Sequence, residues 1–373
     1  MSSKVYFVDK QYKKTGQVLQ AQGVSKPLIV CDDSFKFLNF SQKIGFLSQK
    51  HDICFKFFTN FQPNPDYSSV AEGVKFFQDS KCDAIFAIGG GSAIDVAKCI
   101  KLYAHQDANE LLLDKPFEKN DVKLFAMPTT AGTGSEATKY AVIYYNGEKQ
   151  SITHENCIPE FVFFDTSTLV TLPLYQKKAT MLDALCHAIE SFWSVNSTKY
   201  SQKLARRAIK IIFKNYQQYL DGNQKVFAKM FKAANLAGQA INITQTTAGH
   251  AMSYKLTSMY GLSHGHAVAL CLNALIPYVW ENKDRCSDLR GVIYFNKMLQ
   301  RLAVTMGAKT FKDVGTIFSN LLQELELEVP KMKAGDIKIL AHSVNATRLK
   351  NFPISLSEGE IEKLYKVVLK KGK

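Results

Sequence analysis

The first half of the chain alternates short apolar runs with segments of helical periodicity. The run PLIVCDD at residues 27–33 stays apolar until it ends in two acids, which is typical of a strand buried on both faces of a parallel sheet. Residues 68–81 and 93–106 space their apolar side chains as a helix does. This alternation predicts an α/β domain with a parallel sheet covered by helices. The predicted strands lie at residues 27–33, 51–61, 82–88, 123–130, 140–145 and 160–165.

The pattern changes near residue 175, where the strand-like runs give way to long segments with a period of 3.6 residues. A chain of 373 residues is long enough for two domains. We therefore expect an α/β domain at residues 1–174 and an all-α domain at residues 175–373. The predicted helices of the second domain include residues 177–195, 201–220, 225–241, 264–280 and 361–371.

Composition narrows the classes of function. Hydrophobic residues make up 46% of the chain, yet no apolar run approaches the roughly 20 residues that span a bilayer, so we expect no membrane partner. Asp9 and Lys10 interrupt the apolar stretch near the N-terminus, so we expect no signal peptide. The eight cysteines form no CxxC pair, which favours reduced thiols and a cytoplasmic protein.

The net charge of +14 is unevenly distributed. Residues 1–174 carry 18 basic and 19 acidic side chains, whereas residues 175–373 carry 29 and 14. A basic second domain is compatible with nucleic acid, with an anionic small substrate or with a plain solvated surface. The basic residues follow helical patterns and no zinc-knuckle or RNP-type motif occurs, so we expect no nucleic-acid partner.

A glycine-rich loop, Gly89-Gly90-Gly91-Ser92, lies between a predicted strand and a predicted helix. Glycine lets the backbone approach a phosphate closely, and the N–H groups at a helix start favour an anion. The alternative is a tight turn without a ligand. The spacing differs from GxGxxG, so any dinucleotide is wrapped differently from the usual Rossmann arrangement.

A second loop, PTTAGTGSEAT at residues 128–138, gathers several hydroxyls after another strand. These suit phosphate, ribose or a carboxamide, or else they stabilise the loop by bonds to its own backbone. Asp32 ends the first predicted strand, where a carboxylate can accept from ribose hydroxyls and disfavour the 2′-phosphate of NADP. Capping the next helix explains Asp32 equally well.

Four side chains are candidates for a metal site. Asp183 and His187 lie four residues apart in a helical segment and so share one face, and His250 and His264 follow further along. One carboxylate with imidazoles suits a divalent cation, and an open coordination position makes that cation a Lewis acid. Taken singly, each histidine is better explained as an ordinary core or surface residue. The hypothesis depends on all four occurring together.

Three neighbours of these candidates need separate interpretation. Cys186 points about 100° away from His187 on a helix, so we do not count it as a ligand. His266 is a candidate to hold the metal ligands in position without binding the metal itself, and Glu190 is a candidate to orient His187. Both are equally explained as structural residues.

Together these motifs resemble those of the iron-containing (group III) alcohol dehydrogenase family. The resemblance extends over at least residues 28–275 and includes His250 and His264 with their spacing. It implies an NAD-binding α/β domain, a helical metal- and substrate-binding domain in the dehydroquinate synthase-like architecture, and a homodimer. The other matched motifs are IGGGSAIDVAK at 88–98, MPTTAGTGSEAT at 127–138 and LDALCHAIES at 182–191.

The resemblance also implies roles for individual residues. It implies Fe²⁺ or Zn²⁺ as the metal cofactor and NAD(H) as the redox cofactor. The metal ligands, which are catalytic through the metal, would be Asp183, His187, His250 and His264. The residues implied to contact NAD(H) are Asp32, Asn64, Gly90, Gly91, Ser92, Asp95, Thr129, Thr130 and Thr133.

One position departs from the family pattern. Many members carry a further histidine four residues after the first of the late pair, where this chain has Tyr254. The family's histidine is thought to assist proton delivery, whereas a tyrosine with a pKa near 10 donates a proton but is a poor base at neutral pH. We therefore treat Tyr254 as a candidate catalytic residue.

The segments around residues 136–155 and 249–270 resemble a narrower subgroup, the phosphonoacetaldehyde reductases. That resemblance implies NAD(H)-linked reduction of a small anionic aldehyde, phosphonoacetaldehyde, to 2-hydroxyethylphosphonate. Lys139 and Lys255 are candidate anion partners, although a solvated surface explains either lysine better.

Other functions remain compatible with the sequence. A family dehydrogenase for neutral short-chain alcohols would carry the same motifs, and a glycerol dehydrogenase-like polyol dehydrogenase would share the domain plan with a related metal site. Dehydroquinate synthase shares the architecture, but we find no match to its substrate-binding basic residues. A basic nucleic-acid-binding protein would leave the glycine loop and the ligand set unexplained.

Overall fold

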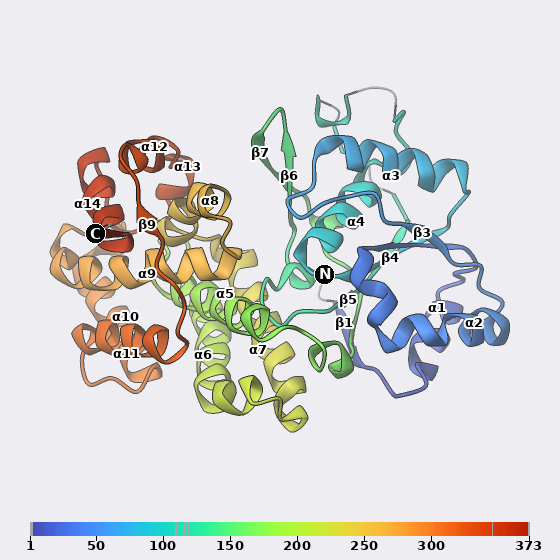
Figure 1. The fold of residues 1–373 in the computed structure, drawn as a ribbon, viewed down its shortest axis with the longest axis horizontal. Coiled ribbons are helices and arrows are strands. Elements are labelled where there is room, and N and C mark those ends of the chain that lie inside the picture. Colours follow the sequence, from blue (N-terminus) through green and yellow to red (C-terminus); the bar gives the residue numbers. More distant parts are fainter. Residues whose placement is uncertain (1–2, 109–110, 115, 118–119, 345, 372–373) are drawn as a thin grey trace. The chain divides into compact units, whose positions relative to one another are not determined.

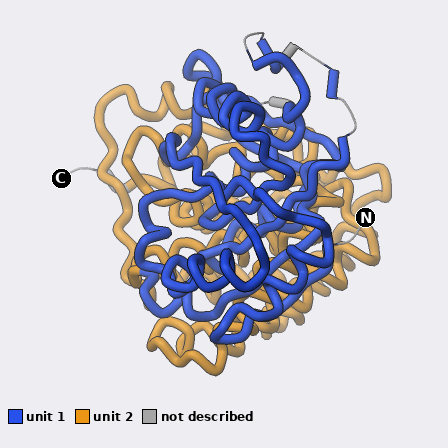
Figure 2. The backbone as a smooth tube through the Cα atoms, turned by 90° about the vertical axis from the view of Figure 1, so that its right-hand side faces the viewer, with its two compact units in different colours: residues 1–172 blue, residues 173–373 orange. Residues whose placement is uncertain are grey.

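The computed structural model describes residues 3–371 except 109–110, 115, 118–119 and 345. The chain divides into two compact units, Met1–Leu172 and Pro173–Lys373, which are coloured separately in Figure 2. The chain passes from the first unit to the second once, between Leu172 and Pro173.

The first unit is built on a six-stranded sheet in the order β1-β8-β5-β4-β2-β3, and its neighbouring strands all pair in parallel (Figure 1). The inner strands β2 and β4 are buried along their whole length, as their continuous apolar runs predict. The strands are β1 (Lys4–Phe7), β2 (Pro27–Cys31), β3 (Lys56–Phe58), β4 (Ala84–Gly89), β5 (Lys123–Pro128) and β8 (Phe161–Phe164).

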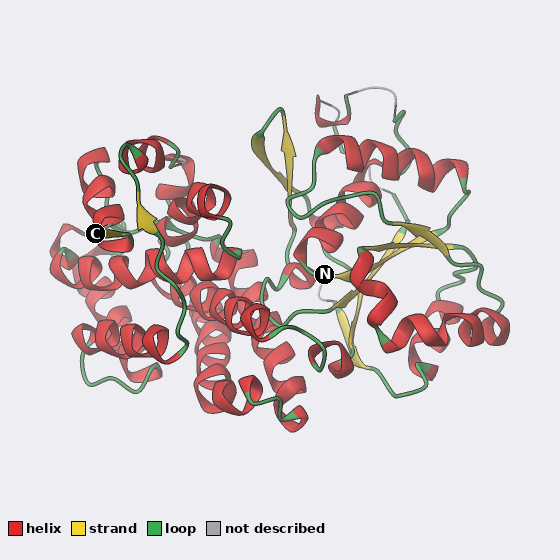
Figure 3. Cartoon of the chain, in the orientation of Figure 1, coloured by secondary structure: helices red, strands yellow, loops and turns green. Residues whose placement is uncertain are grey.

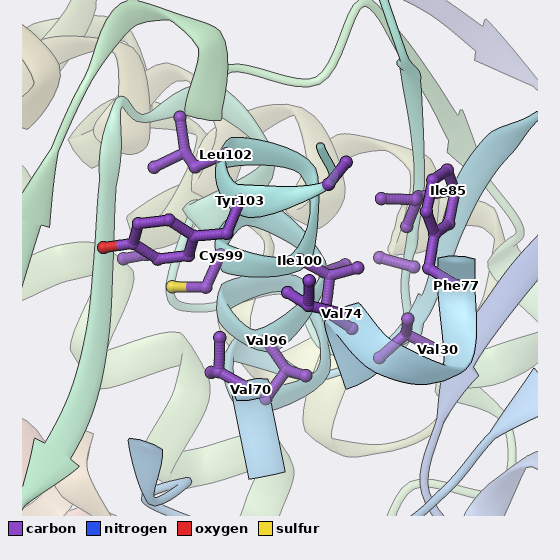
Figure 4. Close-up of a cluster of buried hydrophobic side chains, with 14 of the residues drawn as sticks. Val30, Val70, Val74, Phe77, Ile85, Val96, Cys99, Ile100, Leu102 and Tyr103 are labelled. Carbon is purple, nitrogen blue, oxygen red and sulfur yellow. The ribbon is translucent and has the colours of Figure 1, made fainter. Parts of the chain in front are cut away.

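Helices cover both faces of this sheet because successive strand residues point to opposite sides. Leu28 and Val30 of β2 pack with α3 and α4, whereas Ile29 and Cys31 pack with α1 and α2. Figure 4 shows the first of these cores, with Val30 and Ile85 beside side chains from α3 and α4. The helices are α1 (Lys13–Ala21), α2 (Asn39–His51), α3 (Tyr67–Asp79) and α4 (Gly91–Tyr103). The predicted α/β class is confirmed.

Two predicted strands of this unit differ from the structure. Of residues 51–61, only β3 is extended, because His51 is the last residue of α2. Residues 140–145 do form a strand, β6 (Tyr140–Tyr145), but it pairs antiparallel with β7 (Glu148–Thr153) in a separate hairpin. Asn146 and Gly147 both have positive φ at the tip, the backbone that a tight two-residue hairpin turn needs.

The second unit is helical, as predicted, apart from a two-residue parallel pair of β9 (Lys331–Met332) and β10 (Lys370–Lys371) (Figure 3). The predicted helix at 361–371 therefore ends early, at Val368. The helices are α5 (Leu174–Trp193), α6 (Lys199–Leu220), α7 (Phe227–Thr244), α8 (Ala248–Tyr260), α9 (His264–Glu281), α10 (Gly291–Thr305), α11 (Phe311–Glu324), α12 (Asp336–His342), α13 (Ala346–Leu349) and α14 (Glu358–Val368).

Helix α5 is the centre of this unit. It packs against α6, α7, α9 and α10, and every residue from Met181 to Trp193 is buried. A helix surrounded in this way brings its polar side chains into the protein interior, where each needs a partner. Among the described residues, no helix combines the length and the apolar composition needed to cross a bilayer.

Candidate functional site

The glycine loop lies where β4 ends and α4 begins. Gly90 is the N-cap of α4, and its extended backbone turns the chain from strand into helix. A Cβ added to Gly91 would lie 3.1 Å from Cγ2 of Thr133, and one added to Gly90 would lie 3.9 Å from Cγ2 of Thr130. Ser92 follows in the first turn of the helix. Gly91 thus allows the start of the helix, whose first N–H groups lack intrahelical partners, to lie close to Thr133 of the threonine loop, whereas at Gly90 a side chain would make only ordinary contact.

The threonine loop is tied to the glycine loop and to α4. Thr129 donates its backbone N–H to the carbonyl of Gly89 over 3.0 Å. The ammonium of Lys98 on α4 is fully buried and donates to Ser135 Oγ at 2.9 Å and to Thr138 Oγ1 at 3.1 Å. Lys98 is therefore an anchor of this loop, and sequence reasoning missed it although it ends the motif at residues 88–98.

Asp95 has partners inside the protein for both of its carboxylate oxygens. One oxygen accepts from Ser135 Oγ at 2.7 Å and the other from the backbone N–H of Val142 at 3.0 Å. Burial raises the pKa of Asp95, and the nearby ammonium of Lys98 works in the opposite direction. Asp95 thus joins α4 to the threonine loop and to the β6–β7 hairpin.

Asp32 and Asn64 lie after neighbouring strands of the sheet. One oxygen of Asp32 accepts from the backbone N–H of Ser34 at 2.8 Å and so caps the short helix at 33–37. Its other oxygen lies 3.7 Å from where a Cβ on Gly89 would be, beside the glycine loop. Both interpretations of Asp32 thus fit its position. Asn64 is exposed in a left-handed turn that follows β3.

The four predicted metal ligands converge within the helical unit. Asp183 and His187 come from one face of α5, His250 from the first turn of α8, and His264 from the first residue of α9. Nε2 of His250, His187 and His264 lies 3.5, 3.9 and 4.0 Å, respectively, from Oδ1 of Asp183. One ligand atom each from Asp183, His187 and His250 lies within 4.8 Å of the other two.

Burial makes this arrangement costly without a cation. The side chains of Asp183, His187 and His250 are at most 7% exposed, whereas His264 is 37% exposed. In the described part of the chain, Oδ1 of Asp183 and Nε2 of His250 have no hydrogen-bond partner. Buried polar atoms without partners are rare in proteins, so these two atoms fit a metal ligand set of one carboxylate and imidazoles.

Electrostatics favour the metal-binding protonation state at Asp183 and His187, whereas His250 holds a proton that a bound cation has to displace. Burial raises the pKa of Asp183, but the three imidazoles around it outweigh burial and lower the pKa overall. Burial lowers the pKa of His187 to about 4, so its imidazole is neutral near pH 7, the form that binds metal. Burial alone would lower the pKa of His250, but Glu190 and Asp183 raise it to about 10. The same negative charges attract a divalent cation.

Glu190 orients His250 and not His187, contrary to the sequence-based expectation. Its fully buried carboxylate contacts Nδ1 of His250 and accepts from Thr247 Oγ1 at 2.5 Å and from the backbone N–H of Gly249 at 2.8 Å. A carboxylate on Nδ1 leaves Nε2 of His250 directed at Asp183, an arrangement typical of metal-binding histidines. No sequence pattern indicates this contact, because it joins residues on two different helices.

Two glycines allow the ligands to approach one another. A Cβ on Gly265, next to His264, would lie 2.0 Å from the carbonyl oxygen of Ala179 and 2.6 Å from Cβ of Asp183. A Cβ on Gly249, next to His250, would lie 2.9 Å from Oε1 of Glu190. Both glycines therefore permit close contact with α5, and their place beside each late histidine is the signal that sequence reasoning overlooked.

The remaining candidates are placed as follows. The half-buried ring of Tyr254 stacks on His264 with centroids 5.7 Å apart and planes 6° apart. Nδ1 of His266 lies 3.1 Å from the hydroxyl of Tyr175, and Cys186 is buried outside the ligand set. Lys139 donates to Glu155 at 3.0 Å, so this lysine already has an acidic partner. Lys255 is exposed on α8.

Comparison with known proteins covers nearly the whole chain. The family model described as iron-containing alcohol dehydrogenase matches residues 2–166, and the model for the C-terminal part of that family matches residues 177–369. Alcohol dehydrogenase 4 of Saccharomyces cerevisiae is 29% identical over 97% of this chain and 95% of its own. The NAD-dependent methanol dehydrogenase of Bacillus methanolicus is 32% identical over 72% of this chain and 71% of its own.

Solved structures agree with these matches. An iron-containing alcohol dehydrogenase from Thermotoga maritima is 28% identical, with a TM-score of 0.84 over 99% of this chain and 98% of that one. A sulfoacetaldehyde reductase from Bifidobacterium kashiwanohense, solved in complex with NAD⁺, is 25% identical, with a TM-score of 0.86 over 98% and 97%.

We expect Gly265→Ala to lower the free energy of unfolding by about 2 kcal/mol or more and to reduce bound metal, because the added methyl group would collide with the backbone of α5. Urea unfolding and elemental analysis measure the two effects. The control is Gly359→Ala in α14, where a Cβ meets nothing within 4 Å and the change should stay within about 1 kcal/mol. Wild-type stability and metal content in Gly265→Ala would contradict the packing argument.

We expect Glu190→Gln to weaken metal binding about 10- to 100-fold, because the neutral amide no longer stabilises a proton on Nδ1 of His250 while Nε2 binds the metal. Competition against a chelator of known affinity measures the change. Glu281→Gln, at the exposed end of α9, is the matched control and should retain wild-type affinity. Equal affinities in the two variants would remove Glu190 from this role.

Proposed function

Because the chain belongs to the iron-containing alcohol dehydrogenase family and is an NAD-dependent oxidoreductase, we propose that it reduces a small anionic aldehyde to the alcohol with NADH. The proposed substrate is phosphonoacetaldehyde, and its reduction gives 2-hydroxyethylphosphonate. The observation that carries the proposal is the convergence of Asp183 with three imidazoles, in which two buried ligand atoms have no hydrogen-bond partner among the described residues.

We assign the metal to Asp183, His187, His250 and His264. A divalent ion, Fe²⁺ or Zn²⁺, supplies a Lewis acid for the substrate oxygen when it is bound. The protein's own part is to hold this donor set in place, through Glu190 behind His250 and through the close approach of α9 to α5. The donor set suits either metal, so metal content has to be measured.

We assign NAD(H) to the carboxyl ends of β2, β4 and β5 and to the turn after β3. Gly90, Gly91 and Ser92 offer the N-terminus of α4 to the pyrophosphate. Thr129, Thr130 and Thr133 offer hydroxyls beside it, and Asp32 offers a carboxylate to the ribose. Asn64 and Asp95 complete the assigned set, Asp95 as an internal support of the threonine loop.

Tyr254 is proposed to complete the proton path. In aldehyde reduction the product oxygen gains a proton, and a phenolic hydroxyl is a group that can donate one. Its parallel stacking on His264 supports a place beside the ligand set. The hydride comes from the nicotinamide, and the protein contributes alignment and exclusion of water.

Two observations support an anionic substrate. Residues 175–373 carry 29 basic and 14 acidic side chains, and the similar structure from Bifidobacterium kashiwanohense is named a sulfoacetaldehyde reductase. Lys255, one residue after Tyr254, is exposed and is the candidate to bind the anion, whereas Lys139 is paired with Glu155.

A dehydrogenase for neutral short-chain alcohols is the second candidate function, favoured by the names of the yeast and Bacillus methanolicus relatives.

We also propose a cytoplasmic homodimer. All eight cysteines, each of which the structure describes, are free thiols, as a reducing compartment would keep them. Strand β1 is an edge of the sheet and exposes Val5 and Phe7 at 42% and 51%. An exposed apolar edge strand is suited to pairing with a second copy of the chain.

We expect NADH oxidation to be fastest with phosphonoacetaldehyde or sulfoacetaldehyde, slower with propanal, and lost after treatment with a chelator. The expected cause is attraction between the basic unit and the anionic group, together with loss of the Lewis acid on chelation. Initial rates over a concentration series measure kcat/KM for each aldehyde, and restored Fe²⁺ or Zn²⁺ controls for damage. Faster turnover of propanal would favour the second candidate, and full activity in verified metal-free enzyme would reject the mechanism.

We expect Asp32→Gly to reduce the preference for NADH over NADPH by about tenfold or more, because a carboxylate placed against a 2′-phosphate costs several kcal/mol. Glycine is chosen because it replaces a helix cap at a cost of only a few tenths of a kcal/mol. The ratio of kcat/KM for the two cofactors is the measurement. Asp33→Gly, at the exposed neighbouring acid, should leave the ratio unchanged, and an unchanged ratio in Asp32→Gly would exclude Asp32 from cofactor selection.

A further inference from the structure

A basic groove lies in the helical unit, apart from the residues assigned above. Its cavity, of about 390 Å³, is lined by residues of α6 and α10 and by Phe192 of α5. On α6 the lining residues Lys199, Lys203, Arg206 and Lys210 lie at positions i, i+4, i+7 and i+11. They therefore share one face of the helix and form a row about 16 Å long.

The positive charge of this groove is not balanced nearby. Arg301 of α10 adds a fifth cation to the lining. Helix α6 carries six basic residues and no acid, and α10 carries two basic residues and no acid. Within the described ranges, none of the five lining cations has a carboxylate oxygen within 4.0 Å. Uncompensated cations around a cavity attract a ligand with more than one negative charge.

The base of the groove is apolar, unlike its rim. Phe192 is buried there at 2% exposure, and Thr305 is also buried. Val304, in contrast, is 65% exposed and presents an aliphatic surface to the cavity. A cavity of this volume lies within the range of small-molecule sites, which combine apolar walls with a few placed polar groups. The ligand should therefore have an apolar body as well as its charges.

The groove is separate from the proposed metal centre. Phe192 follows His187 by five residues, which places the two side chains about 140° apart around α5. None of the residues that line the groove is a proposed metal ligand or a proposed NAD(H) contact. The inference therefore does not depend on the proposed dehydrogenase function.

We propose that this groove binds a nucleoside polyphosphate. Its phosphates would lie along the basic row of α6 and near Arg301, and its nucleobase would lie against Phe192 and Val304. A fatty carboxylate would neutralise one of the five cations and leave four. A nucleic acid strand would use the charges but would not need a hollow with an apolar base. A nucleoside triphosphate matches both the multiple charges and the apolar surface.

Calorimetric titration of the metal-loaded protein with ATP, at saturating NADH, tests the proposal. NADH competes for the cofactor site proposed on the first unit, and the groove variants show independently of that proposal which site ATP occupies. We expect saturable binding of one ATP per chain, with a Kd that rises about tenfold or more in Arg206→Gln/Arg301→Gln, because two charge-assisted contacts are lost. The matched control, Arg207→Gln/Lys214→Gln, removes two charges from exposed positions of α6 outside the groove and should change Kd less than about threefold.

A second variant tests the apolar surface that Val304 presents to the groove. Val304→Trp fills the cavity from an exposed position, and it should weaken ATP binding while inorganic triphosphate binds as before. Absence of a saturable ATP site, equal losses in the two double variants, or equal affinity for ATP and triphosphate would each overturn the proposal. Tighter binding of a single-stranded oligonucleotide than of ATP would overturn it in favour of nucleic acid. Because these measurements do not use turnover, failure of the dehydrogenase assays would leave them interpretable.

Discussion

A carboxylate buried among three imidazoles is the constraint that organises the helical unit. Asp183 is 3% exposed, and its Oδ1 lies within 4.0 Å of Nε2 of His187, His250 and His264. Burying an ion without compensation costs several kcal/mol, so this cluster is stable only with positive charge at its centre. The ligands come from three helices, and the fold of the unit has to bring those helices to one point.

The fold meets this requirement through contacts that are themselves buried. Glu190 extends the charged cluster across α5 and α8 by contacting Nδ1 of His250. Gly265 removes the side chain that would otherwise separate His264 from α5. Lys98 has a parallel role in the first unit, where its buried ammonium ties the threonine loop to α4. In both units the residues that position the candidate site are as buried as the hydrophobic core.

Sequence reasoning succeeded where a local pattern determines the structure. The apolar runs of β2 and β4 indicated inner strands because both faces of each strand are buried, and helical spacing placed Asp183 and His187 on one face of α5. Strand β1 was not predicted, because three of its four residues are exposed and its partner β8 lies far along the chain. The turn signal of Asn146-Gly147 was present, but the hairpin it predicts was overlooked.

The spacing of residues along the chain could not predict contacts between different helices. Glu190 lies one turn from His187 in sequence, yet its partner is His250, sixty residues later. Sequence reasoning named the late histidines, but it paired Glu190 with His187 and overlooked the glycines that let α8 and α9 approach α5. These features depend on how side chains from separate helices pack together, whereas the hydrophobic pattern of the sequence predicts only where each helix lies.

Because the chain passes only once between its two units, the residues proposed for the two cofactors are encoded in separate parts of the gene. The residues assigned to the nicotinamide cofactor all precede Leu172, and those assigned to the cation all follow Pro173. A gene that recombines near this junction can exchange one cofactor preference for another while it keeps the metal ligands unchanged. Selection can therefore act on the electron carrier and on the substrate in different stretches of the same gene.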